Sequence, residues 1–92
     1  MSLLLGFAFT DAALKSLKTI PPKFRVQIMK KAKALQRNPT PQGAELLKGK
    51  FAKNNQTVYR IRSGKYRILY IFENNPSQVI ILDIGHRKDV YR

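Results

Sequence analysis

Arginine is the residue type whose placement in this sequence first suggests chemistry. Arg60 and Arg62 lie two positions apart in one segment of alternating residues, and Arg67 follows in the next such segment. Side chains two apart on a strand share a face, so a hairpin of these segments would place Arg67 across from Arg60 or Arg62. Like charges that face each other destabilise a sheet. A bound anion would remove the repulsion; the alternative is that each arginine is separately solvated.

The overall charge also points to an anionic partner. The chain has 18 Lys and Arg against 5 Asp and Glu, which gives a net charge of +13. A small domain needs a charge of only about 2–8 to stay soluble. A guanidinium matches two phosphate oxygens and stacks on nucleobases. We therefore expect a polyanion as partner, while an acidic protein or a merely basic surface are the alternatives.

Two side chains near the C-terminal end could move protons. Histidine is the usual acid or base near neutral pH, which makes His86 a candidate, although it could equally make a structural hydrogen bond. Tyr91 could stack on a base or transfer a proton, or it could pack the tail onto the sheet.

Neither a nucleophile arrangement nor a glycine-rich phosphate loop is visible in the sequence. An enzyme of this kind would therefore use a nucleophile of its substrate, such as the 2′-hydroxyl of RNA. Arginines would stabilise the charge that forms on the phosphate, each by about 2.7–4 kcal/mol. Lysines in the loops and turns are expected to bind the RNA backbone, and these are Lys48, Lys50, Lys53, Lys65 and Lys88.

Length and composition narrow the classes of protein to which the chain could belong. The 92 residues predict a single domain, residues 1–92, and no apolar run is long enough to span a bilayer. The N-terminal residues lack the basic flank of a signal peptide. With no cysteine, one histidine and 5 acidic residues, we expect neither a metal site nor a cofactor. A cytoplasmic location without membrane contact fits these features.

Hydrophobic periodicity predicts an α+β domain. The expected elements are a strand over Leu3–Phe9, helices over Asp11–Lys18 and Pro22–Gln36, and strands over Val58–Arg62, Tyr66–Phe72 and Gln78–Ile84. The last three strands would form an antiparallel meander whose one face is covered by the helix hairpin. The N-terminal strand would join this sheet beside one of the later strands. The third meander strand is nearly all apolar, so we expect it to be central and covered on both faces.

Several side-chain positions follow from these periods. Leu14 and Leu17 are expected to face inward from the first helix. The second helix carries an apolar stripe of Phe24, Ile28, Ala32 and Leu35. Residues 38–55 show no clear period and are expected to be irregular, with one helical turn over Ala44–Leu47. Gly85–Arg92 is expected to be a polar tail.

Two motifs carry a family resemblance. The segment Tyr59–Tyr70 reads YRIRSGKYRILY, and Ile84–Arg92 reads IGHRKDVYR. Together with Leu47-Lys48-Gly49 and Phe9-Thr10, they resemble the RelE toxins of the RelE/ParE superfamily over almost the whole chain.

The resemblance implies an mRNA interferase that enters the ribosomal A site and cuts the codon there by attack of the 2′-hydroxyl. The implied partners are the ribosome with its rRNA, the mRNA, and an acidic antitoxin that wraps the toxin in a hetero-oligomer. By position, Arg67 matches the arginine that stabilises the scissile phosphate, and Arg87 matches a second phosphate ligand. Tyr91 matches a tyrosine that stacks on the substrate.

Arg60 and Arg62 match basic residues that activate the 2′-hydroxyl or bind phosphate, and His86 matches relatives that read GHR. The best-known members have lysines at the first two positions. Arginine is a poor general base because its pKa exceeds about 12. The base would then be Tyr91, His86 or solvent.

Two other functions remain open. A ParE-like toxin of the same fold would poison DNA gyrase through protein contact, although such chains usually lack the arginines together with the tyrosine. A non-catalytic protein would bind rRNA through charge alone.

Overall fold

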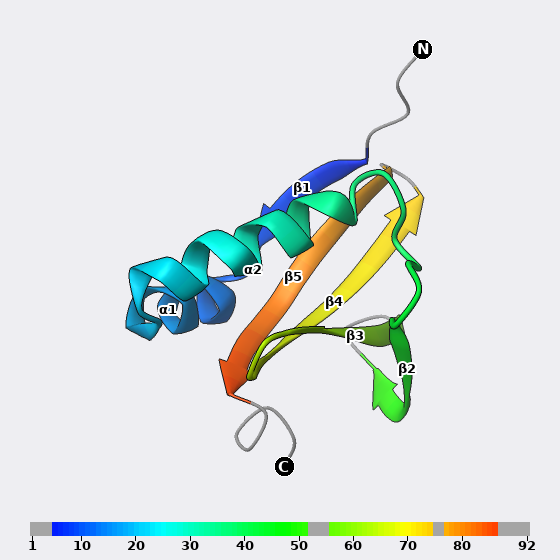
Figure 1. The fold of residues 1–92 in the computed structure, drawn as a ribbon. Coiled ribbons are helices and arrows are strands. Elements are labelled where there is room, and N and C mark those ends of the chain that lie inside the picture. Colours follow the sequence, from blue (N-terminus) through cyan, green and yellow to red (C-terminus); the bar gives the residue numbers. More distant parts are fainter. Residues whose placement is uncertain (1–4, 52–55, 75–76, 87–92) are drawn as a thin grey trace.

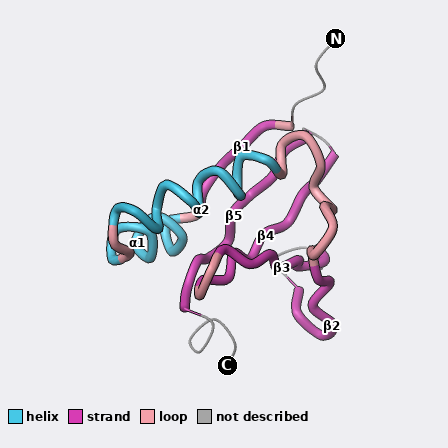
Figure 2. Tube along the Cα trace, in the orientation of Figure 1, coloured by secondary structure: helices cyan, strands magenta, loops and turns pink. Residues whose placement is uncertain are grey.

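The computed structural model describes residues 5–51, 56–74 and 77–86 (Figure 1). The elements are β1 (Gly6–Phe9), α1 (Asp11–Thr19), α2 (Pro22–Ala34), β2 (Glu45–Phe51), β3 (Thr57–Ser63), β4 (Tyr66–Asn74) and β5 (Ser77–His86). Both helices lie on one side of the sheet, as Figure 1 and Figure 2 show. The predicted α+β class is confirmed, with a helix hairpin on a sheet that includes the meander β3–β5.

The sheet has five strands in the order β1-β5-β4-β3-β2. β1 runs parallel to β5, and the other neighbouring pairs are antiparallel. The N-terminal strand therefore joins the sheet beside a meander strand, as predicted. β5 is central, between β1 and β4, which is also as predicted.

Thr10 connects β1 to α1 and fixes where the helix begins. Its hydroxyl accepts from the Ala13 N–H at 3.1 Å and donates to the Leu82 carbonyl at 2.6 Å. This is the N-cap role that threonine commonly fills. The phase set by this cap buries Ala13 and half-buries Leu17, whereas Leu14 is 43% exposed. The prediction that Leu14 faces inward is therefore wrong, because the face that packs on the sheet passes through Ala13 instead.

The core lies between the helices and the sheet. Ile28, Ala32 and Leu35 are fully buried, which confirms most of the predicted stripe, and Phe24 is half-buried. α2 ends at Ala34, two residues before the predicted end, but Leu35 still packs in the core. The strand residues buried in this core are Ile61, Ile68, Tyr70, Val79, Ile81 and Ile84.

β2 corrects the prediction for the middle of the chain. Glu45–Phe51 is a strand, so neither the helical turn over Ala44–Leu47 nor a fully irregular segment 38–55 is right. The residues Ala44 to Leu47 are good helix formers, but pairing with β3 overrides that weak preference. Glu45 pairs with Arg60 and Leu46 with Tyr59.

One extra residue in β5 forms a β-bulge, and it keeps apolar side chains facing the helices on both sides of the bulge. Leu69 pairs with Asp83 and Tyr70 pairs with Ile81, so Leu82 has no partner on β4. Such a bulge shifts the alternation by one residue. Ile81 before the bulge and Ile84 after it therefore both reach the core under the helices. β5 also extends to His86, so Gly85 and His86 are strand residues and not part of the predicted tail.

The other face of the sheet, which we call the open face, has its own small apolar cluster. Leu47, Val58 and Ile71 are buried there, with Leu69, Ile80 and Leu82 packed around them. No helix residue belongs to this cluster among the described residues. Ile80 and Leu82 are only half-buried, so the prediction that β5 is covered on both faces is wrong for this face.

Glu73 of β4 is bonded to β5 and to the residue before β3, at the end of the sheet far from the β3–β4 turn. Gln78 and Gln56 donate hydrogen bonds to its carboxylate. These bonds, the one from Gln78 above all, hold the pKa of Glu73 below its usual range.

Neither α1 nor α2 combines the length and apolar character that crossing a bilayer would require.

Candidate phosphate-binding site

The β3–β4 hairpin brings the predicted arginines together. Its turn contains Gly64 with a φ of +60°, a conformation that glycine adopts without strain. This turn sets a register in which Arg62 pairs directly with Arg67, and Arg60 pairs with Leu69. This register places Arg60, Arg62 and Arg67 on the open face, and Arg62 also lines a cavity with Lys31 and Ala34 of α2. We call these three residues the arginine cluster.

The three guanidiniums differ in exposure. Arg67 is 9% exposed, and the side chain of Arg60 is 13% exposed, whereas that of Arg62 is 64% exposed. Arg67 donates from a terminal nitrogen to the Tyr66 carbonyl at 3.4 Å. Burying a charge is costly unless it is paired, so buried guanidiniums are held by fixed contacts. These contacts restrict the positions of the arginines. Such positions suit a site that binds an anion with little rearrangement.

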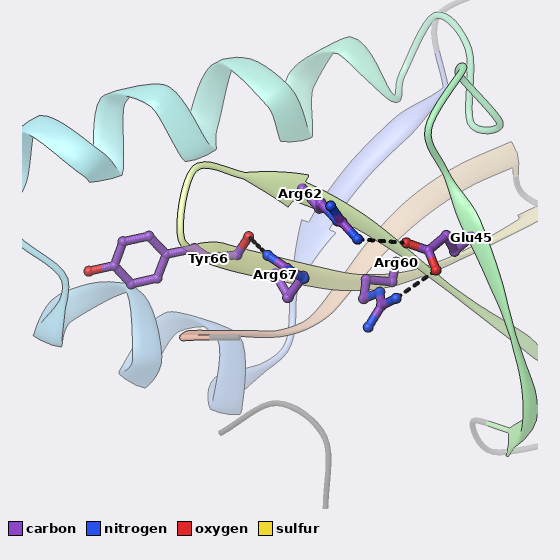
Figure 3. A network of polar contacts seen from close by, with 5 residues as sticks. All are labelled: Glu45, Arg60, Arg62, Tyr66 and Arg67. Atoms are coloured by element: carbon purple, nitrogen blue, oxygen red, sulfur yellow. Dashed lines mark hydrogen bonds and ion pairs between the residues drawn. The ribbon is translucent and has the colours of Figure 1, made fainter. Parts of the chain in front are cut away.

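Glu45 is the residue of this site that the sequence analysis missed. One of its carboxylate oxygens accepts from an Arg60 terminal nitrogen at 2.6 Å, and the other lies 3.9 Å from an Arg62 terminal nitrogen (Figure 3). Part of the repulsion between the arginines is therefore relieved inside the chain. A bound anion would relieve the repulsion that remains.

A signal for Glu45 did exist in the sequence. It is one of only 5 acidic residues, and it precedes Leu46-Leu47. Reading that stretch as a strand would have placed Glu45 on an edge beside the arginines. The helical preference of the same residues hid this alternative.

Among the described residues, Glu45 is the carboxylate that contacts the cluster, and its ion pairs are with Arg60 and Arg62. Arg62 and Arg67 are register partners, and like charges directly opposite each other destabilise a sheet. Their planar forks can hold two oxygens of one phosphate group each. The arrangement can therefore bind a phosphodiester and stabilise added negative charge on it.

His86 lies on the other side of the sheet from the cluster. It pairs with Tyr66, and their rings meet edge to face at 6.0 Å between centroids. The Tyr66 ring also packs at 5.7 Å from Phe24 of α2, so both rings lie on the helix side. Arg67 instead pairs with Gly85. The structure does not bring His86 to the arginine cluster.

Only some of the other predicted site residues lie in the described parts of the chain. Lys65 is exposed in the β3–β4 turn. Lys48 and Lys50 belong to β2, but their side chains are not described. The predicted residues outside the described parts of the chain are Lys53, Arg87, Lys88 and Tyr91.

Comparisons with known proteins agree on one family. A model of the "ParE toxin of type II toxin-antitoxin system, parDE" matches residues 7–91. The toxin RelG of Mycobacterium tuberculosis is 33% identical over 85 residues, which cover 91% of this chain and 92% of RelG. RelE1 of Methanocaldococcus jannaschii is 33% identical over 79 residues, 86% of each chain.

Solved structures give the same result. A chain of the toxin–antitoxin complex RelBE2 from M. tuberculosis matches with a TM-score of 0.75 and 26% identity, over 97% of this chain and 98% of that one. A chain of the RelE–RelB complex from Pyrococcus horikoshii shares the fold, with a TM-score of 0.75 at 20% identity over 97% and 99%.

Proposed function

The chain belongs to the RelE/ParE superfamily of type II toxin–antitoxin toxins, and we propose that it is an endoribonuclease that cuts mRNA in the ribosomal A site. The observation that carries this proposal is the arginine cluster on the open face. Three guanidiniums from neighbouring strands share that face, beside a sheet surface that no described helix covers. A net charge of +13 suits a partner as anionic as the ribosome.

The proposed reaction is an in-line attack of the RNA 2′-hydroxyl on the adjacent phosphorus. The 2′-oxygen loses its proton and forms a bond to phosphorus, while the bond to the 5′-oxygen breaks and that oxygen takes up a proton. The products are a 2′,3′-cyclic phosphate and a 5′-hydroxyl. Negative charge grows on the phosphate oxygens in the transition state. Arg67 is held nearly buried and is the residue that we propose to stabilise this charge.

The other arginines would bind and orient the RNA. Arg62 is the most exposed of the cluster and faces Arg67, so the same phosphate can contact both. Arg60 is paired with Glu45 and would contact a neighbouring phosphate only when this ion pair opens. Arg87 and Tyr91 keep the roles that the resemblance implies, a phosphate contact and stacking on the substrate. The general base is not assigned.

An antitoxin is the proposed protein partner. RelBE2 and the P. horikoshii relative were solved as toxin–antitoxin complexes. The open face combines a half-covered apolar cluster with the arginine cluster. An amphipathic helix or strand with acidic residues along one side would match both, and it would cover the arginines in a hetero-oligomer.

The family model carries the ParE name, whereas RelG and RelE1 carry names of the RelE group. A gyrase poison is therefore the second candidate. A protein that only contacts gyrase has no need for guanidiniums held together on one sheet face. The arginine cluster favours RNA cleavage for this reason.

Primer extension on a defined mRNA tests the proposal. Induced expression of the chain should produce new 5′ ends at fixed positions within codons. These ends should disappear when translation of that mRNA is blocked by deleting its start codon, because cleavage would need the A site. Intact mRNA together with gyrase-dependent DNA breaks would instead establish the ParE-like function. RNA binding without any cut would leave a non-catalytic protein.

A further inference from the structure

A second polar cleft lies at the edge of the sheet, on the helix side. Its volume is about 320 Å³, and it is bounded by α1 and by the ends of β4 and β5. The side chains that line it include two aliphatic hydroxyls, a carboxylate, a phenol and an imidazole, from Ser16, Thr19, Asp83, Tyr66 and His86. Nothing in the proposed cleavage step uses this cleft.

The protons of both aliphatic hydroxyls are used in hydrogen bonds within the cleft. Ser16 Oγ donates to Asp83 Oδ1 at 2.8 Å, and Thr19 Oγ1 donates to the Ser16 carbonyl at 2.7 Å. The Ile84 N–H also donates to Asp83 Oδ1, at 2.8 Å. The second carboxylate oxygen, Asp83 Oδ2, makes none of these bonds, and an ionised carboxylate can only accept. The Ser16, Thr19 and Asp83 side chains therefore present acceptors to any ligand.

The rest of the lining suits a flat ring. Tyr66 and His86 both line the cleft, and their rings meet edge to face at 6.0 Å between centroids, so aromatic surface borders the space that a ligand would occupy. Nucleobases stack on aromatic side chains in most sites that bind single-stranded RNA. Because the whole chain carries a charge of +13, a free cation is a less suitable occupant than a neutral base attached to an RNA backbone.

The cleft and Arg67 border the same strand, β5, from opposite faces of the sheet. Gly85 lines the cleft and is the register partner of Arg67. β1 pairs with β5 only from Gln78 to Ile81, and Thr10 then leads into α1. No described strand therefore lies beside Asp83–His86 on that side. An RNA strand can pass this edge with a phosphate at Arg67 and a neighbouring base in the cleft.

We propose that this cleft binds a nucleobase that carries an exocyclic amino group, and that Asp83 selects it against uracil. The amino group would donate to Asp83 Oδ2. Uracil presents a carbonyl oxygen where cytosine presents an amino group, so it would place an acceptor against an acceptor. The inference rests on the proposed RNA-binding function and adds a choice of base to it.

Binding of two pyrimidine oligonucleotides tests the inference. The probes are 2′-O-methyl octamers of cytidine and of uridine, which the protein cannot cleave because the attacking hydroxyl is blocked. Fluorescence anisotropy at one salt concentration should show that the native protein binds oligocytidine about tenfold more tightly, which is typical of one correct base contact.

Asp83→Asn is the decisive variant. The amide oxygen can still accept from Ser16 and Ile84, which turns the NH₂ group toward the ligand. This variant should bind oligouridine as tightly as oligocytidine or more tightly. Asp11→Asn changes the charge equally at an exposed position of α1 and should keep the tenfold preference.

Ser16→Ala separates a structural role from base selection. It removes one bond to Asp83 but leaves the carboxylate, so the preference for oligocytidine should persist. If Asp83→Asn lowers the thermal midpoint but keeps the preference for oligocytidine, as Ser16→Ala should, Asp83 is merely a structural residue and the inference is wrong.

Equal, salt-dependent binding of both octamers by the native protein would overturn the inference and leave the proposed RNA function intact. Failure to bind either octamer at low salt would contradict both.

Discussion

The two faces of the sheet differ in what covers them. On the helix-covered face, fully buried residues such as Ile28 and Tyr70 pack between the layers. On the open face, a smaller cluster around Val58 is only partly covered and borders Arg62 and Arg67. The chain thus satisfies one face with its own helices and leaves the other to partners. Stability should depend on the first face and function on the second.

A matched pair of isoleucines tests this division most strongly. Ile28→Ala opens a cavity in the covered core and should lower the free energy of unfolding by about 2–5 kcal/mol. Ile80→Ala removes the same atoms from the half-buried open face and should cost only about 1 kcal/mol. Urea denaturation of both variants measures the difference. Equal losses would show that the open face is as much a core as the covered one.

Arg67→Ala should give the largest functional loss on the open face. Losing one donor that stabilises transition-state charge typically costs about 10²–10³ in rate, or about 2.7–4 kcal/mol. Single-turnover mRNA cleavage on programmed ribosomes measures this rate, and Arg67→Lys should recover part of it.

Arg37→Ala is the control, because it removes the same charge from an exposed position just beyond α2. It should retain nearly native cleavage. Since Arg67 is nearly buried, circular dichroism must first show that its variants are folded. A folded Arg67→Ala protein with the native rate would remove Arg67 from the mechanism.

The pH dependence of the free energy of unfolding tests the contribution of Tyr70 to the covered face. Its hydroxyl donates to the Pro39 carbonyl at 2.6 Å, and Tyr70→Phe should cost about 1 kcal/mol. Burial, and secondarily the neighbouring Tyr59, raise the pKa of Tyr70 above its usual range. The neutral phenol is thus favoured in the folded state. Its contribution is complete below the unfolded pKa of about 10 and is lost as the pH rises through the higher folded pKa.

The native protein should therefore lose stability above about pH 10 more steeply than Tyr70→Phe. Urea denaturation between neutral and alkaline pH compares the two slopes. Identical slopes would show that the Tyr70 phenol does not contribute to the alkaline loss.

Glu45→Gln should give the smallest effect and act on the open face alone. Without the carboxylate, Arg60 can turn to an RNA phosphate. The slope of log K against log salt should become steeper by about 0.7, the value for one more phosphate contact on single-stranded RNA. Glu73→Gln makes the same change at the far end of the sheet and should leave the slope unchanged. A similar change in both variants would indicate a general charge effect.

The covered face was largely predictable from the sequence because its periods are regular. The stripe of Ile28, Ala32 and Leu35 and the alternation in β3 and β4 predicted which residues meet. Leu14 was misplaced because the phase of a short helix depends on its cap contact, which comes from Leu82, far along the chain.

The open face was predictable only in part. The hairpin period placed Arg67 across from Arg60 or Arg62, and the structure selects Arg62. β2 was missed because its pairing with β3 is a tertiary contact that overrides local preference. Glu45 was missed with it. The bulge at Leu82 leaves no local mark, so the separation of His86 from the arginines could not be foreseen either.

The arginine side-chain Nε–H signals, observed by NMR during titration with a non-cleavable 2′-O-methyl RNA, test the central claim most directly. We expect the signals of Arg60, Arg62 and Arg67 to shift together and saturate, while those of Arg25 and Arg37 on the helix side stay in place. The opposite pattern, with the helix arginines shifting and the cluster unchanged, would contradict the account.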